Sequence, residues 1–526
     1  MDWLMAGGIF VVLAVLFAGF YFSVRARNQS QHALLRNFPL LGRMRYVLEH
    51  LGPELRQYLF DGDRTGKPFS REDYLSMVMA SKYLNTLVSF GSKRDYEEPG
   101  WYLRNALLPS LREEMGIDDK PSIETQRYVM DHDGIFHRRE HVEKVDVASW
   151  TLTEDFALRM GEDLPHPWVL RGMIGMGGMS YGALGRTAIE ALSSGLAMAG
   201  SSWMNTGEGG LSPHHLKGGA PIVVQIGPGL HGVRDADGGF DWSEFRKKAA
   251  LDAVVGFELK LHQGAKIRGG HLEGEKVTPE IAEIRGVPAW QTINSPNRFP
   301  MISDVDDLFE WIARLRQEGG KPVGIKIVVG GPGSVDELAL AMAQRGDGPD
   351  WITVDGGEGG SGATYREMAD SVGMPSRAAI IEADDALRRA GVRDRVKIIA
   401  SGKLFSADRI ALALCFGADA VNVARGMMIS VGCIQTQRCH SNTCPVGVAT
   451  TDEKLIEALV VDEKQFRVLN YVTTLRASIA ALAAAAGLKS PTEFRRHHAV
   501  WRAEGQLPRS AEDLFPTVSD AAVQAD

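Results

Sequence analysis

The sequence predicts an α/β fold: a (β/α)8 TIM barrel with an N-terminal transmembrane helix and helical N- and C-terminal extensions. Two observations support this fold class. Between residues 165 and 450, eight short runs rich in β-branched residues each end in glycine or a small polar residue and precede a helical segment. Near the N-terminus, 22 consecutive residues carry no charge. A length of 526 residues accommodates one barrel and its flanking regions.

The first element is an apolar segment over residues 3–24. A helix of this length rises about 33 Å, enough to cross a hydrocarbon core of about 30 Å. A cleaved signal peptide is the alternative, but Asp2 precedes the apolar run instead of a basic region, and no clear cleavage site closes it. Arg25 and Arg27 follow the run. We therefore expect a single-pass membrane protein with a cytoplasmic catalytic domain.

Residues 28–150 are expected to form a mainly helical N-terminal region. Amphipathic stretches at residues 44–51 and 71–87 are separated by polar connections, and we find no chemistry in them. After the barrel, an alanine-rich helix is expected over residues 452–487. It belongs to a helical C-terminal extension and tail over residues 451–526.

The eight predicted barrel strands are 169–174, 200–205, 221–226, 254–259, 323–328, 351–354, 396–400 and 418–423. In a (β/α)8 barrel, catalytic groups lie at the carboxyl ends of the strands. Catalytic and ligand-binding residues are therefore expected just after each run.

Composition limits the function further. Apolar residues make up 44% and charged residues 24% of the chain, which excludes a disordered or fibrous protein. The 58 lysines and arginines against 66 acidic residues give a net charge of -8, so no nucleic-acid partner is expected. Three of the four cysteines fall within residues 433–444, which indicates a metal site in a reducing compartment.

Three strand ends are unusually rich in glycine: residues 175–182, 205–210 and 355–362. Glycine allows main-chain N–H groups to approach a ligand and form anion-binding nests. Any one run could be a tight turn only, but three at equivalent positions favour a phosphate-bearing cofactor. None matches the dinucleotide fingerprint of a Rossmann fold.

Lys326 lies inside an otherwise apolar predicted strand. A cation there would stabilise negative charge on a reduced flavin. The alternative is a lysine that extends to the barrel rim.

The spacing Cys433-x5-Cys439-x4-Cys444-Pro445 follows the eighth strand. Three thiolates suit an iron–sulfur cluster with one iron that no protein side chain ligates, and Cys-Pro recurs at such sites. Zinc with His440 as a fourth ligand is the competing interpretation, although adjacent Cys439 and His440 fit one tetrahedral ion poorly. The separate Cys415 is expected to be a small buried hydrophobe.

A loop between the fourth and fifth strands gathers cations: Lys266, Arg268, Lys276 and Arg285. Such groups clamp the carboxylates of a dicarboxylate substrate through charge-assisted hydrogen bonds. A solvated charged loop is the alternative.

Five motifs together resemble the FMN-binding synthase domain of glutamate synthases, in the shorter glutamate synthase-like branch, over roughly residues 165–450. The motifs are Met179-Ser-Tyr-Gly-Ala-Leu184, Asn205-Thr-Gly-Glu-Gly-Gly210, Gln263-Gly-Ala-Lys266, Gly360-Ser-Gly-Ala363 and Cys433-Ile-Gln-Thr-Gln-Arg-Cys-His-Ser-Asn-Thr-Cys444 with the following Pro-Val-Gly-Val-Ala-Thr.

The resemblance implies a 3Fe-4S cluster on Cys433, Cys439 and Cys444, and FMN at the barrel mouth. The FMN-binding residues that it implies are Met179, Ser180, Asn205, Gln225, Lys326, Gly356, Gly357, Gly359, Gly360, Gly402, Arg425 and Gly426. On the substrate side it implies Lys266, His271 and Arg285, which would bind 2-oxoglutarate or a related 2-oxo acid. The sequence departs from the family there, with Pro228-Gly229 in place of Ser-Gly and His271 in place of a glutamine in a loop one residue shorter.

The activity that the resemblance implies is reductive amination of 2-oxoglutarate to glutamate, an oxidoreduction of the CH-NH2 class, with Glu208 and Lys266 as catalytic residues. Glu208 could instead only order its glycine loop. We expect external ammonia or an amine, because no cysteine precedes Cys415 to serve an amidotransferase, and ferredoxin or another electron donor. The alternatives are an N-substituted glutamate synthase that uses an alkylamine, and a membrane-tethered electron-transfer flavoprotein without synthase activity.

Overall fold

The computed structural model describes residues 2–92, 95–120, 122–134, 138–264, 266–267 and 269–518. The chain divides into two units, Met1–Leu75 and Ser76–Asp526.

The first unit is helical. It contains α1 (Asp2–Asn28), α2 (Ala33–Asn37), α3 (Leu41–Leu55) and a π-helical turn, η1 (Arg56–Phe60). The part of α1 from Met5 to Asn28 has a mean hydropathy of 2.3 and buries none of its most apolar stretch. A membrane span and a signal sequence both have these properties.

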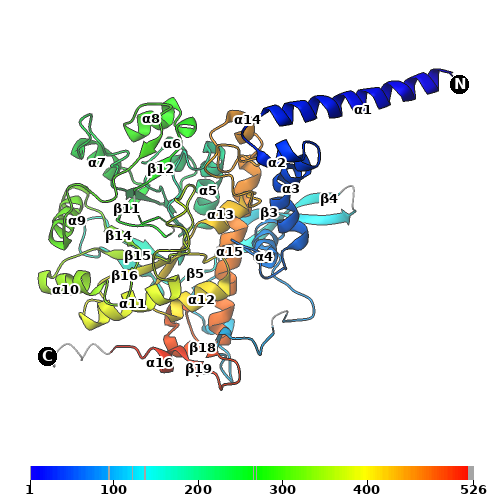
Figure 1. Cartoon of the computed structure of the whole chain (residues 1–526). Coiled ribbons are helices and arrows are strands. Elements are labelled where there is room, and N and C mark those ends of the chain that lie inside the picture. Colours follow the sequence, from blue (N-terminus) through cyan, green and yellow to red (C-terminus); the bar gives the residue numbers. More distant parts are fainter. Residues whose placement is uncertain are drawn as a thin grey trace. The chain divides into compact units, whose positions relative to one another are not determined.

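Eight parallel strands close into a barrel in the second unit, as predicted (Figure 1). They are β8 (Ile174–Met176), β9 (Met204–Asn205), β10 (Ile222–Ile226), β11 (Val254–Lys260), β14 (Val323–Ile327), β15 (Trp351–Asp355), β16 (Lys397–Ser401) and β17 (Ala420–Val423). Consecutive strands pair in parallel, and β17 pairs with β8 to close the ring. Six of the eight strands lie within two residues of the predicted runs.

The helices that surround the barrel have apolar inner faces. They are α5 (Arg186–Ala199), α7 (Trp242–Ala249), α9 (Val305–Gly319), α10 (Asp336–Arg345), α11 (Ser376–Arg389), α12 (Ala407–Cys415) and α13 (Arg425–Ser430). In α9, for example, Leu308, Ile312 and Leu315 are buried at helical spacing. Its N-cap Asp304 accepts a hydrogen bond from the Asp307 N–H, and the helix ends at left-handed Gly320.

The first predicted strand, 169–174, is wrong in its bounds. Only its first two residues belong to an antiparallel hairpin, β6 (Leu158–Met160) with β7 (Trp168–Leu170), and the barrel strand begins only at Ile174. The physical reason is tertiary packing, because Trp168 contacts Trp203 and Trp351 edge-on with ring centroids 5.4 and 5.6 Å apart. The hairpin side chains fill one end of the barrel core.

The second predicted strand, 200–205, is also shorter than expected. Gly200 and Ser201 have positive φ, and the Gly200 carbonyl accepts from the buried Arg476 guanidinium at 2.6 Å. The backbone there turns toward Arg476, so only Met204–Asn205 joins the barrel.

The expectation of a mainly helical region over 28–150 holds only as far as α4 (Arg71–Tyr83). Beyond it lie β1 (Gly100–Leu103) and a long antiparallel hairpin, β3 (Ser122–Asp133) with β4 (Arg138–Ala148). The short strands β2 (Ile117–Asp118) and β5 (Thr151–Leu152) pair with each other. Thr125 and Tyr128 of β3 donate to Asn470 and Glu463 of α15, so the hairpin is tied to the C-terminal extension.

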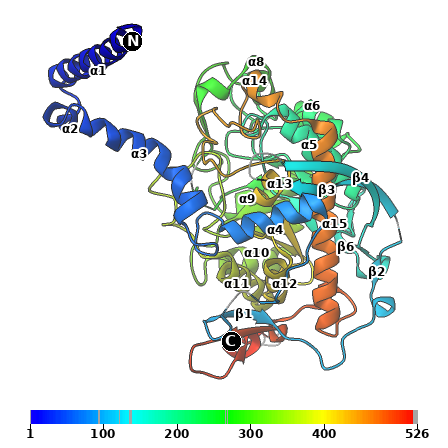
Figure 2. The ribbon, with the colours of Figure 1, turned by 90° about the vertical axis from the view of Figure 1, so that its right-hand side faces the viewer.

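The C-terminal extension is built on α15 (Val461–Ala485), which follows α14 (Glu453–Ile456). Figure 2 shows β3 crossing α15. Asn470 on α15 joins the two, because it accepts from the Thr125 hydroxyl at 2.6 Å and donates to the Gln126 carbonyl at 2.8 Å. By length and composition α15 would also pass as a membrane span, but 61% of its most apolar stretch is buried, so it is a core helix.

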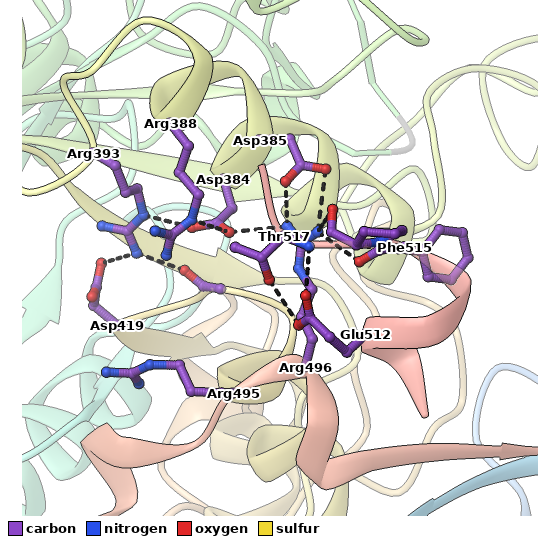
Figure 3. Close-up of polar contacts among 12 residues, drawn as sticks. Asp384, Asp385, Arg388, Arg393, Asp419, Arg495, Arg496, Glu512, Phe515 and Thr517 are labelled. Atoms are coloured by element: carbon purple, nitrogen blue, oxygen red, sulfur yellow. Dashed lines mark hydrogen bonds and ion pairs between the residues drawn. The ribbon is translucent and has the colours of Figure 1, made fainter. Parts of the chain in front are cut away.

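The extension also contains strand structure that was not predicted. Strand β18 (Ala499–Arg502) pairs with both β1 and β19 (Arg509–Ser510), and α16 (Ala511–Leu514) follows. Arg496, just before β18, donates to Asp384 and Asp385 of α11 and to the Phe515 carbonyl (Figure 3). This network fixes the extension to the barrel.

Candidate functional site

Glu208 and Lys260 form a buried ion pair at the carboxyl ends of two barrel strands. Glu208 lies in the loop after β9, Lys260 is the last residue of β11, and their Nζ and Oε1 atoms are 2.7 Å apart. Burial alone would raise the pKa of Glu208, but the Lys260 ammonium, with Lys266 and His231 nearby, lowers that pKa below its usual value. The site therefore holds an ionised carboxylate among cations.

The loop after β11 is tied to the glycine-rich loop after β15. Lys260 donates to Gln263 Oε1 at 2.8 Å, and Gln263 Nε2 donates to the Gly360 carbonyl at 2.7 Å. Lys266, 3% exposed, donates to the Ala363 carbonyl at 2.8 Å. The expected cations are thus positioned by two loops, although Ala265 and Arg268 lie outside the described residues.

Arg285 ends α8 (Pro279–Arg285) and is buried. Its Nη2 donates to the Tyr181 carbonyl at 3.0 Å, while its Nε is buried without a hydrogen-bond partner among the described residues. Burial lowers the pKa of this guanidinium to about 10, and Glu208 opposes that shift. A Cβ at Gly209 would lie 2.6 Å from Arg285 Nη2, so glycine is required for this close approach. A buried cation with a free donor suits an anionic ligand.

His271, the other expected substrate residue, starts β12 (His271–Leu272), which pairs with β13 (Ile293–Asn294). Its Nδ1 lies 2.7 Å from Asn294 Oδ1 and its Nε2 lies 3.0 Å from Glu273 Oε1. The Tyr365 hydroxyl is 3.4 Å from Nδ1. These contacts engage the ring within its own hairpin and with Tyr365, and none joins it to Lys266 or Arg285.

His231 is a site residue that the sequence analysis missed. It lies after β10 and is 4% exposed, with Nδ1 3.3 Å from the Arg285 carbonyl and Nε2 3.4 Å from Ser295 Oγ. Burial, with Arg285 nearby, lowers its pKa to about 4, so the ring is neutral. Its position directly after Pro228-Gly229-Leu230, where the sequence departs from the family, was the available signal.

Lys326 on β14 is 6% exposed, and its Nζ lies 3.2 Å from Asp355 Oδ2 at the end of β15. It therefore does not extend to solvent at the rim. The same Asp355 oxygen accepts from the Gly264 N–H at 2.9 Å. Lys326 thus lies beside the loops that carry the predicted glycines Gly356, Gly357, Gly359 and Gly360.

The loops after β15, β16 and β17 meet at glycines, which leave the main chain without side chains around it. Gly402 has φ +120°, and a Cβ there would lie 3.2 Å from the Gly356 nitrogen, so both its conformation and its surroundings require glycine. Arg425, which precedes Gly426 in α13, donates to the Glu358 carbonyl at 2.8 Å. Glycine main-chain groups beside a part-buried guanidinium, after the last strands of a barrel, fit a phosphate group.

Asn205 and Gln225, expected at the cofactor, converge on a carboxylate that the sequence analysis missed. Their amide nitrogens donate to Glu258 Oε1 at 2.8 and 2.7 Å. Trp351 Nε1 and the Thr353 hydroxyl donate to the other oxygen of Glu258. Four donors satisfy this charge, which is 1% exposed, at the barrel centre. Glu258 and Lys260 are two residues apart in β11, so their side chains lie on the same face of the strand. This spacing of two charged residues could have identified both as site candidates in the sequence.

Ser180, next to Met179, orders the neighbouring glycine loop. Its Oγ accepts from the Gly209 N–H at 3.1 Å, while Met179 is buried. The loop after β8 and the loop after β9 are therefore joined at the barrel mouth.

Cys433, Cys439 and Cys444 lie in the loop after α13. Burial raises the pKa of the Cys433 thiol to about 12, and the charges of Cys439 and Cys444 add to the effect. Within the described residues, no three His, Cys, Asp or Glu side chains converge closely enough to hold a metal ion as they stand. The chemistry of the set, three neighbouring thiols on one loop, nevertheless fits a cluster with three protein ligands. Cys415 is buried, as expected.

Lys276 links this cysteine loop to the barrel mouth. It is 1% exposed, and its Nζ donates to the carbonyls of Ala183, Cys439 and Ala449 at 2.8, 3.1 and 3.1 Å. Burial lowers the pKa of this lysine to about 8, while Cys439 and Cys444 raise it. One buried ammonium therefore donates to three carbonyls, one from the loop after β8 and two from the cysteine loop.

Comparison with known proteins identifies the family. A family model for the conserved region in glutamate synthase matches residues 111–489. The glutamate synthase large subunit-like protein YerD of Bacillus subtilis (strain 168) is 51% identical over 498 residues, 94% of each chain. The archaeal-type glutamate synthase (NADPH) of Thermotoga sp. (strain RQ2) is 31% identical over 389 residues, 73% of this chain and 72% of that protein. A flavocytochrome b2 mutant with pyruvate bound aligns with 87% of this chain and 91% of its own at 12% identity and a TM-score of 0.41. On the family model and the sequence relatives, the chain belongs to the glutamate synthase family.

Proposed function

We propose that the protein is an FMN- and iron–sulfur-dependent oxidoreductase that reductively aminates 2-oxoglutarate to glutamate with external ammonia. The observation that carries this proposal is the buried constellation of Glu208, Lys260, Lys266 and Arg285 at the barrel mouth. Three cations around one carboxylate suit an anionic substrate and an amine nucleophile together.

Arg285 and Lys266 hold the two carboxylates of 2-oxoglutarate. The Arg285 Nε needs an acceptor, and Lys266 has an ammonium that can turn from the Ala363 carbonyl toward a ligand. Two fixed cations orient the 2-oxo carbon, and orientation of this kind contributes about 7 kcal/mol or more to lowering a barrier.

Glu208 manages the protons of the amine. Its depressed pKa keeps it ionised at neutral pH, so it attracts ammonium and holds it beside the 2-oxo carbon, where ammonium loses a proton to solvent to give the nucleophile ammonia. Ammonia adds to the 2-oxo carbon, water leaves, and the imine takes up a hydride and a proton to give glutamate. Lys260 keeps the carboxylate in place throughout.

FMN, when bound, would supply hydride chemistry, and a 3Fe-4S cluster would supply single-electron chemistry. The residues that would hold FMN are the predicted ones, among them Gly402, Arg425 and Lys326. The residues that would hold the cluster are Cys433, Cys439 and Cys444. The electrons come from ferredoxin or another external donor.

For α1 we propose a single membrane span with the catalytic unit in the cytoplasm. Its support is the length and hydropathy of Met5–Asn28 and the arginines at residues 25 and 27.

The test is anaerobic. The purified holoprotein is reduced chemically, 2-oxoglutarate and ammonium are added, and flavin reoxidation and glutamate are followed together. The proposal expects reoxidation that needs both additions and a slower reaction in Glu208→Gln. Reoxidation only with an alkylamine would instead support an N-substituted glutamate synthase, and its absence with every amine would support an electron-transfer role.

A further inference from the structure

We propose that residues 33–60, hereafter the surface segment, lie flat on an anionic membrane surface beside the α1 span. This inference rests on the membrane span proposed for α1 and goes beyond it, because it assigns the next two helices and the following π turn a lipid-binding role.

The surface segment has an apolar stripe at helical spacing. The stripe consists of Leu41, Met44, Leu48, Leu51, Leu55 and Leu59. Their separations of three and four residues place all of them on one side of a helix. Leu41, Met44 and Leu48 are 71, 61 and 59% exposed, so the stripe faces outward from the helix.

The other side of α3 is already used inside its own unit. Gly42 is buried, and a Cβ there would lie 3.2 Å from Leu35 Cδ2 of α2. Arg43 lies over the Phe22 ring of α1, 4.6 Å from its centroid. These contacts set the orientation of α3 within its unit and leave the apolar stripe uncovered by the described residues of that unit.

The charge of this part of the chain is opposite to that of the whole. Residues 25–56 contain six arginines and two glutamates, a net charge of +4, whereas the complete chain carries -8. Arginines that flank an apolar helix face attract anionic lipid headgroups while the face enters the boundary with the acyl chains. Charge complementarity therefore favours an anionic lipid surface as the occupant.

The position along the chain agrees with this occupant. Helix α2 starts only five residues after α1 ends, so the surface segment begins at the depth where the proposed span leaves the membrane. An amphipathic helix at that depth meets the headgroup region first.

The experiment is hydrogen exchange on the full-length holoprotein in nanodiscs of phosphatidylcholine alone and of phosphatidylcholine with phosphatidylglycerol. We expect α3 amides to exchange about tenfold more slowly in the anionic nanodiscs, and α1 amides to be protected in both. The variant Met44→Glu/Leu48→Glu/Leu51→Glu should lose the α3 protection and keep that of α1. The matched variant Glu49→Gln/Glu54→Gln, which changes the polar face, should retain both.

Two results would overturn the inference. Unprotected α3 amides with protected α1 amides would show that α1 spans and the surface segment does not bind lipid. Protection of α3 that is equal in both lipid mixtures and in a lipid-free amphipathic polymer would show that a protein surface covers the stripe. Failure of the proposed span is distinguishable, because α1 itself would then exchange rapidly.

Discussion

Lys260 donates to Glu208 across 2.7 Å, although the two residues come from the ends of different strands and their side chains are only 6 and 15% exposed. The pair joins the loop after β9 to β11, and it fixes a negative charge in the cationic site. Because both side chains are largely removed from water, the Glu208 carboxylate depends on the Lys260 ammonium to stay ionised.

Lys260→Met should therefore destabilise the protein by about 3–5 kcal/mol, the range for breaking a buried ion pair. Without the ammonium, burial dominates and the pKa of Glu208 rises, so the pH range of activity should move upward. Denaturant unfolding and pH–rate profiles measure the two effects. Lys260→Met/Glu208→Gln should recover most of the stability but not the activity, and unchanged stability in the single variant would contradict the coupling.

Arg285→Lys should raise the KM for the 2-oxo acid at least tenfold, because lysine keeps the charge but loses the planar donors. Flavin content, read from absorbance, should stay at the wild-type level. The control is Arg234→Lys, which alters a part-buried arginine whose contact with the Gly229 carbonyl is 3.5 Å long. An unaltered KM in Arg285→Lys would remove this residue from the substrate site.

Lys276→Met should leave the carbonyls of Ala183, Cys439 and Ala449 without their shared donor, at about 1–3 kcal/mol for each unsatisfied group. We expect the variant to bind less iron and to show an altered electron paramagnetic resonance signal while it keeps its flavin. Lys217→Met removes a surface ion pair with Glu190 and serves as the control. Normal iron content and an unaltered signal would show that Lys276 does not position the cysteine loop.

His215 provides a pH prediction. Burial lowers its pKa to about 3, from about 6.5 in the unfolded chain, so the unfolded state binds the proton first. The stability gained from the neutral, buried His215 is therefore complete above about pH 6.5. As pH falls below that value, the free energy of unfolding decreases by up to about 1.4 kcal/mol per pH unit. His215→Gln should reduce the slope of unfolding free energy between pH 4 and 6, while exposed His166→Gln should not. If the unfolding free energy of the wild type and of His215→Gln depends on pH with the same slope, His215 does not contribute to the loss of stability in acid.

Asp384 on α11 accepts from three arginines, Arg388, Arg393 and Arg496 (Figure 3). Asp384→Asn should cost about 3–5 kcal/mol, since three cations lose a shared buried carboxylate. Proteolysis should then begin in the C-terminal extension, because Arg496 holds it to α11. The exposed residue change Asp394→Asn is the control, and a variant as resistant as the wild type would argue against this role.

The barrel was predictable because its strands are continuous β-branched runs whose glycine-rich ends fall at one face. The two strands with wrong bounds failed for a tertiary reason. Trp168 packs across the barrel end, and Arg476 captures the Gly200 carbonyl, and neither contact leaves a local pattern.

Within the site, the cysteine spacing and the cations Lys266 and Arg285 were visible in the sequence because their neighbours are distinctive. Glu258 and Lys260 were overlooked inside a strand that otherwise reads as apolar, although their alternation places both on one face of β11. The role of Lys276 could not be predicted, because its three acceptors are backbone carbonyls far from it in the sequence.

The pairing of β1 with β18 has a consequence during synthesis. Strand β1 (Gly100–Leu103) cannot pair until Ala499–Arg502 has been synthesised, roughly 400 residues later. At about 5–20 residues per second this delay is on the order of 20–80 s. Throughout it β1 lacks the strand that pairs with its backbone N–H and C=O groups, and an unpaired strand edge can pair with another chain. This part of the fold therefore completes only when translation is nearly finished.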